Sequence, residues 1–233
     1  MRDRVNGLGQ PIGEDVDGWA PCPFPPAVTL AGRYCTLEPL AVSHAPDLYE
    51  ELHRDANGAQ WTYMAYGPFT DGEAFGSFVE AVVADRSTVT YALTDPAGRA
   101  QGMASYLRVK PAIGSIEVGS VIFGSALQRT AGATEAMYLM ARNAFDDLGY
   151  RRYEWKCDSL NAPSRAAAER LGFSFEGVWR NATIYKGRNR DTAWYAMTAD
   201  DWRRVRPQIE AWLDPSNFED GRQRTKLSTS TLR

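Results

Sequence analysis

The chain has 233 residues and a net charge of −3, with 44% hydrophobic and 24% charged residues. These values are ordinary for a globular protein and exclude a collagen-like, wholly disordered or coiled-coil chain. The sequence predicts no nucleic-acid partner, because such partners usually meet a concentrated basic face. It predicts no membrane partner either, because no apolar run approaches the roughly 18 residues that span a bilayer.

An extended arm is predicted over residues 1–28, because Gly, Pro and Asp interrupt any helix there. Trp19 and Phe24 are the side chains expected to pin this arm to the domain. The first residues carry charge but lack the apolar core of a secretion signal, so a cytoplasmic location is expected. One domain is predicted over residues 29–213, followed by a flexible polar tail over residues 214–233.

Within the domain, the first half alternates between β and α patterns. The hydrophobic spacing and the turn residues predict the following elements: a strand over 32–40, a helix from Ser43 to about His53, a second helix from Thr70 or Asp71, and strands over 88–95, 99–110 and 115–124. The Asp-Pro-Ala-Gly sequence between the second and third of these strands predicts a hairpin turn.

A long amphipathic helix over 131–148 opens the second half, with Gly149 as its C-terminal cap. The remaining pattern predicts a strand over 151–158, a short helix within 161–173, a hairpin of 173–187 with 190–202, and a last helix capped by Thr198. Strands and helices alternating in this order predict an α/β sandwich, in which helices cover the faces of a mixed sheet.

Cysteine and histidine are too few and too scattered for a metal site. Cys22, Cys35 and Cys157 match no zinc or disulfide spacing, so they are interpreted as small buried side chains in a reducing compartment. His44 and His53 are nine residues apart and do not share a helical face. No Gly-x-Ser-x-Gly sequence places a nucleophilic serine.

A turn of small residues leads into the long helix. Such a turn offers free backbone N–H groups and the positive end of the helix dipole, which suits a phosphate ligand. Ala131, Gly132 and Ala133 let a ligand approach the backbone. The turn matches neither the nucleotide P-loop nor the dinucleotide fingerprint. Many helices begin after a similar turn without any ligand, so the turn alone does not establish a phosphate site.

A second motif follows this loop and identifies a family. It is Asn-Ala-Pro-Ser-Arg-Ala-Ala-Ala-Glu-Arg-Leu-Gly-Phe, and its key positions are Asn161, Ser164, Ala168, Gly172 and Phe173. Together with the loop motif from Gln128 to Glu135, it resembles the GNAT superfamily, the GCN5-related N-acetyltransferases. Within that superfamily it resembles the group that acetylates the N-termini of ribosomal proteins. The resemblance covers about residues 30–200.

The resemblance implies a three-layer α/β/α sandwich around a mixed, mostly antiparallel sheet whose central strand pair splays apart. It also implies acetyl-CoA as the acyl donor, with the pyrophosphate on the loop, the pantetheine arm along the strand at 119–123 and the thioester near Asn161. The cofactor-binding residues implied are Val121, Ile122, Phe123, Gln128, Arg129, Thr130, Ala131, Gly132, Ala133, Thr134, Asn161 and Ser164.

For catalysis, the resemblance implies that a primary amine attacks the thioester directly, with both reactants bound side by side. Ser164 is predicted to protonate the departing thiolate, because Ala168 stands where many relatives carry a tyrosine. Glu117, on the strand before the loop, is predicted to act as the base, and its carboxylate is expected to make the nearby pocket acidic and attractive to an ammonium group. The alternatives are Tyr185 and Tyr195 for the acid, and Asp158 and Glu176 for the base.

Other functions remain open at this point. One alternative is a non-catalytic module that binds acyl-CoA. Ala168 and Ala131, which replace the family's tyrosine and loop glycine, favour this alternative. A structural domain without a cofactor is disfavoured by Gln128 and Asn161. The acceptor is either a protein N-terminus, which needs an open groove, or a small amine, which allows a closed one, and a homodimer is also open. The side chains predicted to wall the acceptor pocket are Trp61, Tyr63, Tyr66 and Phe69.

Overall fold

The computed structural model describes residues 4–54 and 57–229. In this part of the chain, one main sheet has the strand order β1-β2-β3-β4-β5-β6-β8-β7. Its strands are β1 (Leu30–Ala31), β2 (Thr36–Pro39), β3 (Val89–Thr94), β4 (Ala100–Lys110), β5 (Ser115–Phe123), β6 (Arg152–Asp158), β7 (Ser174–Tyr185) and β8 (Arg188–Thr198). All neighbours pair antiparallel except β5 and β6, which are parallel.

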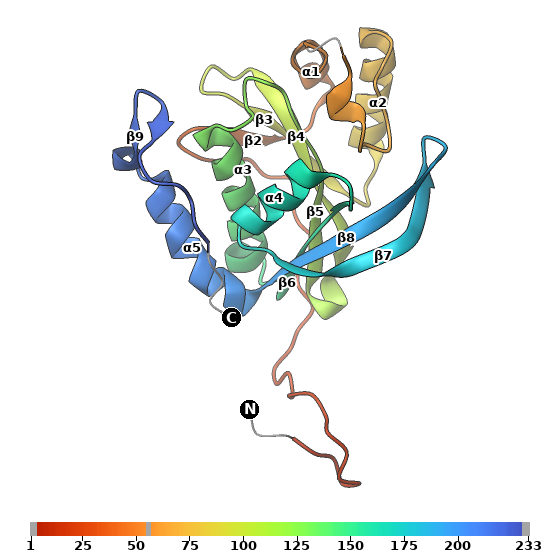
Figure 1. Cartoon of the computed structure of the whole chain (residues 1–233), viewed down its shortest axis with the longest axis vertical. Helices are drawn as coiled ribbons and strands as arrows, with labels where there is room; N and C mark the ends of the chain where they lie inside the picture. Colours follow the sequence, from red (N-terminus) through yellow and green to blue (C-terminus); the bar gives the residue numbers. More distant parts are fainter. Residues whose placement is uncertain (1–3, 55–56, 230–233) are drawn as a thin grey trace.

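Helices cover both faces of this sheet (Figure 1). They are α1 (Ala45–Leu52), α2 (Gly72–Ala84), α3 (Ala131–Arg142), α4 (Ala162–Arg170) and α5 (Ala199–Leu213). Side chains on a strand alternate between faces, so Leu93 joins the core beneath α3 and α5 whereas Ala92 joins the core beneath α1 and α2. These two cores, one on each face, confirm the predicted three-layer sandwich.

The two parallel strands diverge in the middle of the sheet. β5 and β6 pair from Ser115 and Arg152 as far as Val118 and Trp155. Beyond that point β5 continues beside β4 up to Phe123, while β6 continues beside β8. The backbone edges that face each other across the gap are therefore not paired with one another. This confirms the predicted splayed pair and positions the site.

Helix starts follow the capping residues in most cases. The side chains of Asp71, Thr130 and Thr198 each accept a backbone N–H in the first turn of α2, α3 and α5. The prediction that Ser43 caps the first helix is wrong. A 3₁₀ turn (Val42–His44) precedes α1, so its N-cap position falls on His44, whose side chain makes no cap hydrogen bond.

The long helix ends differently from the prediction. Its α-helical part stops at Arg142, and the apolar stripe continues through a wider π turn (Asn143–Asp147). The side chain of Asn143 explains why this turn is stable, because it contacts both the Tyr106 hydroxyl (3.2 Å) and the Asp147 carboxylate (3.2 Å). Gly149 follows with φ 74°, as predicted for the cap.

Trp19 anchors the N-terminal arm, as predicted. Its indole donates to Ala112 O (2.9 Å), and the Arg151 guanidinium lies over its ring. Phe24 is 45% exposed, and its role stays a prediction. Cys22 is buried instead, and the Tyr150 hydroxyl donates to Pro23 O (2.9 Å). Farther toward the N-terminus, the arm runs away from the domain (Figure 1).

The segment after α5 packs on the domain as far as Thr229, whereas the sequence predicts a flexible tail. A 3₁₀ turn (Pro215–Asn217) leads into the short strands β9 (Phe218–Glu219) and β10 (Arg222–Gln223). The Trp212 indole donates to Thr225 O (2.9 Å), Leu227 is buried, and Thr229 donates to Arg170 O (2.9 Å). Leu227 packs into the core of the domain, although the composition of this segment is mostly polar. The domain limits themselves stay predictions.

Replacing Gly172 with alanine is expected to lower the free energy of unfolding by about 2–4 kcal/mol. Its φ is 93°, and an added Cβ would lie 2.7 Å from a methyl group of Val205. Gly149→Ala is a matched control, because φ is again positive (74°) but no atom lies within 4 Å of the added Cβ. We expect the control to lose only about 1–2 kcal/mol in chemical denaturation. Equal losses would contradict a packing role for Gly172.

Candidate active site

A cavity of about 670 Å³ lies where β5 and β6 diverge. Gly119, Ser120 and Val121 of β5 line one side, and Lys156, Cys157 and Asp158 of β6 line the other. The remaining walls come from the loop after α1, the end of β4, the start of α4, and the β7–β8 hairpin. A volume of this size is typical of a small-ligand site.

The cavity brings together predicted residues from β5 and from the second motif. Glu117, Val121, Asn161 and Ser164 all line it, as does the alternative base Asp158. Other predicted residues lie elsewhere: Ile122 belongs to the core beneath α1 and α2, Phe123 packs against the opposite core, and the loop residues 128–134 do not line the cavity.

Ser164 sits in the first turn of α4, where it faces the cavity. The Asn161 side chain caps this helix by accepting the Ser164 N–H (3.2 Å). The Ser164 hydroxyl accepts a hydrogen bond from the Trp155 indole (3.0 Å). Since the hydroxyl oxygen is the acceptor in that contact, its own proton is left to donate. Both motif residues thus have defined local roles as well as a place at the cavity.

Glu117 does not create the acidic pocket that its sequence position suggests. Its side chain is 4% exposed, and each oxygen meets a cation: Arg108 Nη1 binds Oε1 (2.6 Å) and Lys156 Nζ lies 2.7 Å from Oε2. A carboxylate held by two cations presents little free negative charge to a ligand. Its predicted role as the base stays a prediction.

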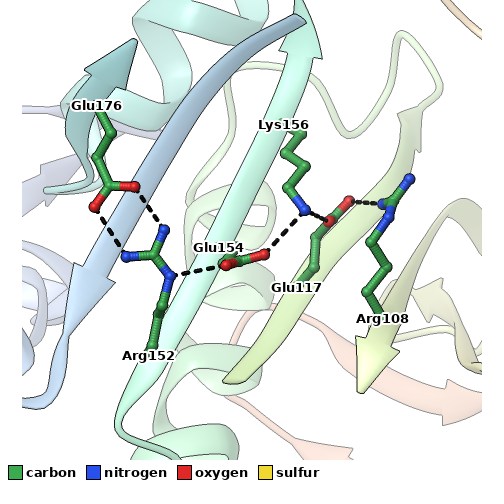
Figure 2. Close-up of polar contacts among 6 residues, drawn as sticks. All are labelled: Arg108, Glu117, Arg152, Glu154, Lys156 and Glu176. Carbon is green, nitrogen blue, oxygen red and sulfur yellow. Dashed lines mark hydrogen bonds and ion pairs between the residues drawn. The ribbon is translucent and has the colours of Figure 1, made fainter. Parts of the chain in front are cut away.

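These contacts belong to a row of alternating charges whose members come from β4, β5, β6 and β7 (Figure 2). From Lys156 the row continues to Glu154 Oε2 (3.0 Å), from Glu154 to Arg152 Nε (2.8 Å), and from Arg152 to Glu176 Oε2 (2.5 Å). Glu176 thus lies at the end of the row away from Arg108, and it does not line the cavity. The middle of the row, Arg152, Glu154 and Lys156, alternates along β6. Its outer partners come from other strands, so the local sequence does not signal them.

The alternative acids are already committed to other partners. The Tyr185 hydroxyl donates to Asp158 Oδ2 (2.7 Å), and burial together with that carboxylate raises the pKa of Tyr185 to about 12. The Tyr195 hydroxyl donates to Glu169 and accepts from Arg165 (3.1 Å in each case), and burial raises its pKa as well. Neither tyrosine lines the cavity. These contacts favour Ser164 over both tyrosines.

The loop before α3 is held by hydrogen bonds at both of its ends. The Gln128 side chain donates to Phe123 O (2.7 Å), and the Thr130 hydroxyl accepts the Ala133 N–H (3.2 Å). Because α3 begins at Ala131, the N–H groups of Ala131 and Gly132 have no acceptor within the helix. Gly132 is buried, and an added Cβ would lie 3.2 Å from Tyr34 O, so its small size serves packing against the protein.

Two buried carboxylates that sequence analysis missed support the loop and the helix. Glu51 of α1 is 2% exposed and accepts the Ala126 N–H (2.9 Å). Glu135 of α3 accepts three backbone N–H groups, those of Arg33 (2.8 Å), Tyr34 (2.6 Å) and Cys35 (3.0 Å). Each holds a segment that is distant in sequence, which is why no local pattern reveals them.

The aromatic wall is only partly as predicted. Tyr63 and Tyr66 line the cavity, whereas Trp61 is buried in the core and Phe69 packs beside it. Two tryptophans of the hairpin, Trp179 and Trp194, line the cavity instead, with ring centroids 4.1 Å apart. Trp179 stands between Val178 and Arg180, and Trp194 between Ala193 and Tyr195, so no local pattern marks them as site residues.

The described residues contain no cluster of three or more side chains suited to a metal ion. Cys157 lines the cavity, but burial raises the pKa of its thiol, which disfavours the reactive thiolate. Among the helices of the described ranges, none has the length and apolarity to cross a membrane.

The arrangement fits acetyl-CoA. Between the diverging strands, unpaired backbone edges line the cavity and suit an extended amide chain. The free N–H groups at the start of α3 suit a pyrophosphate. Ser164 lies at the cavity with a hydroxyl proton to donate.

Comparisons with known proteins agree with this geometry. Residues 35–174 match the acetyltransferase (GNAT) domain model. A GCN5-related N-acetyltransferase from Brucella melitensis is 37% identical, with a TM-score of 0.89 over 91% of this chain and 97% of that chain. A GNAT-family protein from Chromobacterium violaceum is 39% identical, with a TM-score of 0.78 over 83% of this chain and 98% of that chain.

A ribosomal L7/L12 α-N-protein acetyltransferase shares the fold at 20% identity, with a TM-score of 0.63 over 73% of this chain and 94% of that chain. No curated protein matches the chain. Three observations agree: a family model covers more than half of the sequence, solved structures are similar in sequence and fold, and the cavity lies between splayed strands. The chain therefore belongs to the GNAT family of acetyltransferases.

Proposed function

We propose that the protein transfers the acetyl group of acetyl-CoA directly to a primary amine. The observation that carries this proposal is the cavity between β5 and β6, where the diverging strands meet the start of α4 with Asn161 and Ser164. Acetyl-CoA supplies an acyl thioester whose carbonyl carbon accepts the amine. The chain contributes by holding both reactants side by side, which provides much of the rate.

The backbone and the helix starts position the donor in this proposal. Residues 119–123 and Asn161 hold the arm and the thioester end, and residues 128–134 hold the pyrophosphate. In the transfer, a C–N bond forms and the C–S bond breaks with its electron pair on sulfur. The amine releases one proton and the sulfur takes up one, so the protons balance without a redox partner.

Ser164 is the proposed donor of the proton to sulfur, supported by its place at the cavity and by an O–H that the indole contact does not use. Glu117 and Asp158 are the cavity carboxylates that could pass the amine proton to solvent. Asp158 already accepts from Tyr185 and from the Leu160 N–H (2.9 Å), and Glu117 is bound by two cations. A water relay beside one of them is therefore the proposed route for this proton.

Replacing Ala131 with proline is expected to weaken acetyl-CoA binding about tenfold or more, because it removes one N–H from the proposed pyrophosphate site. Proline is well tolerated at the first position of a helix, and Thr130 has the extended backbone (φ −99°, ψ 168°) that suits a following proline. Calorimetric titration with acetyl-CoA measures the change. Ala131→Ser keeps the N–H and should bind like the natural protein.

Unchanged affinity in Ala131→Pro would refute the role of the loop. Acetyl transfer itself is tested by thiol release and by mass spectrometry of the amine products. A protein that binds acetyl-CoA but acetylates no amine would support the non-catalytic alternative.

A further inference from the structure

The charged side chains that line the cavity are predominantly cationic. Arg108, Lys110, Lys156 and Arg190 stand against Glu117 and Asp158, an excess of two positive charges in a chain whose net charge is −3. A pocket of this sign disfavours a polyamine acceptor, whose several ammonium groups would be repelled. It favours a ligand that carries negative charge.

The row of alternating charges explains where this excess is placed. It contains three cations and three carboxylates, and it ends in Arg108 on one side and in Glu176 on the other (Figure 2). Arg108 lines the cavity, but Glu176 does not. The row is therefore neutral as a whole and presents a cation to the cavity.

The cations differ in how many donors they have left. Lys156 is 7% exposed and fully engaged by Glu117, by Glu154 and by the Trp194 ring, whose centroid lies 3.6 Å from Nζ. The Arg108 side chain is 57% exposed and binds Glu117 through Nη1, which leaves further guanidinium donors. Lys110 is exposed and has no ion pair among the described residues. Arg108 and Lys110 thus both have donors available at the cavity.

Hydrogen bonds tie the loop after α1 to other segments beside the cavity. Lys186 and Arg188, at the tip of the β7–β8 hairpin, donate to Trp61 O (2.7 Å) and Thr62 O (2.8 Å). The Tyr63 hydroxyl donates to Leu160 O (3.1 Å). A cavity whose surrounding segments are tied together in this way favours a small molecule over an extended protein N-terminus, which needs an open groove.

We propose that the acceptor is a small primary amine that also carries a carboxylate, and that Arg108 and Lys110 bind this carboxylate. This proposal rests on the proposed function. The exposed face of Trp179 offers an apolar surface for the rest of the acceptor, since this residue is 60% exposed and stacks on Trp194.

The test uses α-amino acids, each paired with its own amide, together with spermidine and an amidated peptide with a free N-terminus. Acetyl-CoA affinity is first measured by calorimetry, and kcat/KM is then measured by thiol release for each amine. We expect the free acids to exceed their amides at least tenfold in kcat/KM, because each amide lacks the charged partner of Arg108 and Lys110.

Variants assign this preference to residues. Lys110→Gln should lower kcat/KM for the acid about tenfold, with less than a twofold effect on its amide and on acetyl-CoA affinity. Arg108→Gln should lower the ratio of kcat/KM for the acid to kcat/KM for its amide about tenfold, and it should also slow both reactions because Glu117 loses a partner. Arg108→Lys should restore part of the loss. Arg203→Gln is the matched control, because Arg203 is an exposed cation of α5 that is paired with Asp200.

Three results would overturn the proposal. The first is a higher kcat/KM for the amides, for spermidine or for the peptide than for the free acids. The second is weaker acetyl-CoA binding in either cavity variant, which would assign these cations to acetyl-CoA. The third is acetyl-CoA binding without acetylation of any acid. Absence of acetyl-CoA binding by the natural protein would instead refute the proposed function.

Discussion

Replacing Ser164 with alanine is expected to lower kcat by about a hundredfold or more, while acetyl-CoA affinity changes less than threefold. The hydroxyl lies at the cavity, accepts the Trp155 indole N–H and retains its own proton, so its loss removes the proposed donor to sulfur. Pre-steady-state thiol release and calorimetry measure the two quantities. The effect should be largest at the chemical step, because the protonated leaving group forms only there.

Ser164→Thr is the matched control, since it retains the hydroxyl at the same position of α4. We expect it to keep most of the activity. Loss of the indole contact alone should lower the free energy of unfolding of the alanine variant by only about 1 kcal/mol, which separates a catalytic from a structural role. If kcat for the alanine variant matches that of the natural protein, another group or water protonates the sulfur.

Replacing Glu135 with alanine is expected to lower the free energy of unfolding by about 3–5 kcal/mol. Glu135 is 6% exposed, and its carboxylate accepts three backbone N–H groups from the turn at Arg33, Tyr34 and Cys35. Alanine leaves these donors buried without an acceptor. Gly32 gives the carboxylate room, since an added Cβ there would overlap Glu135. Urea denaturation measures the loss.

Two variants sharpen this test. Glu135→Gln retains one acceptor oxygen but turns an NH₂ group toward the N–H donors, so an intermediate loss of about 2 kcal/mol is expected. Glu80→Ala removes an exposed glutamate from α2 and should change stability by less than about 0.5 kcal/mol. If Glu135→Ala and Glu80→Ala behave alike, the carboxylate does not hold the turn.

The sequence predicts the order of the elements well, because that order is encoded locally. Alternation of apolar residues marks β3 to β6, and Asp71 and Thr198 mark two helix starts that the structure confirms. The errors fall where several local choices have similar energies. Ser43 is a good capping residue, yet the chain forms a 3₁₀ turn there.

For the candidate site, the sequence located Asn161 and Ser164 because their helix start is a local motif. It also placed Glu117 at the cavity but suggested an acidic pocket. The structure shows the opposite sign, because Arg108 and Lys156 reach Glu117 from neighbouring strands. Which cross-strand residues meet depends on register, and register is decided by the whole sheet.

By itself, the sequence determined the family motifs, the succession of strands and helices and the turn of small residues before α3, since each depends on residues close together in the chain. Only the tertiary structure decided the divergence of β5 from β6, the buried supports at Glu51 and Glu135, and the cationic end of the charge row at Arg108. These features join segments tens of residues apart, and their energies depend on burial and distance, which exist only after the chain has folded.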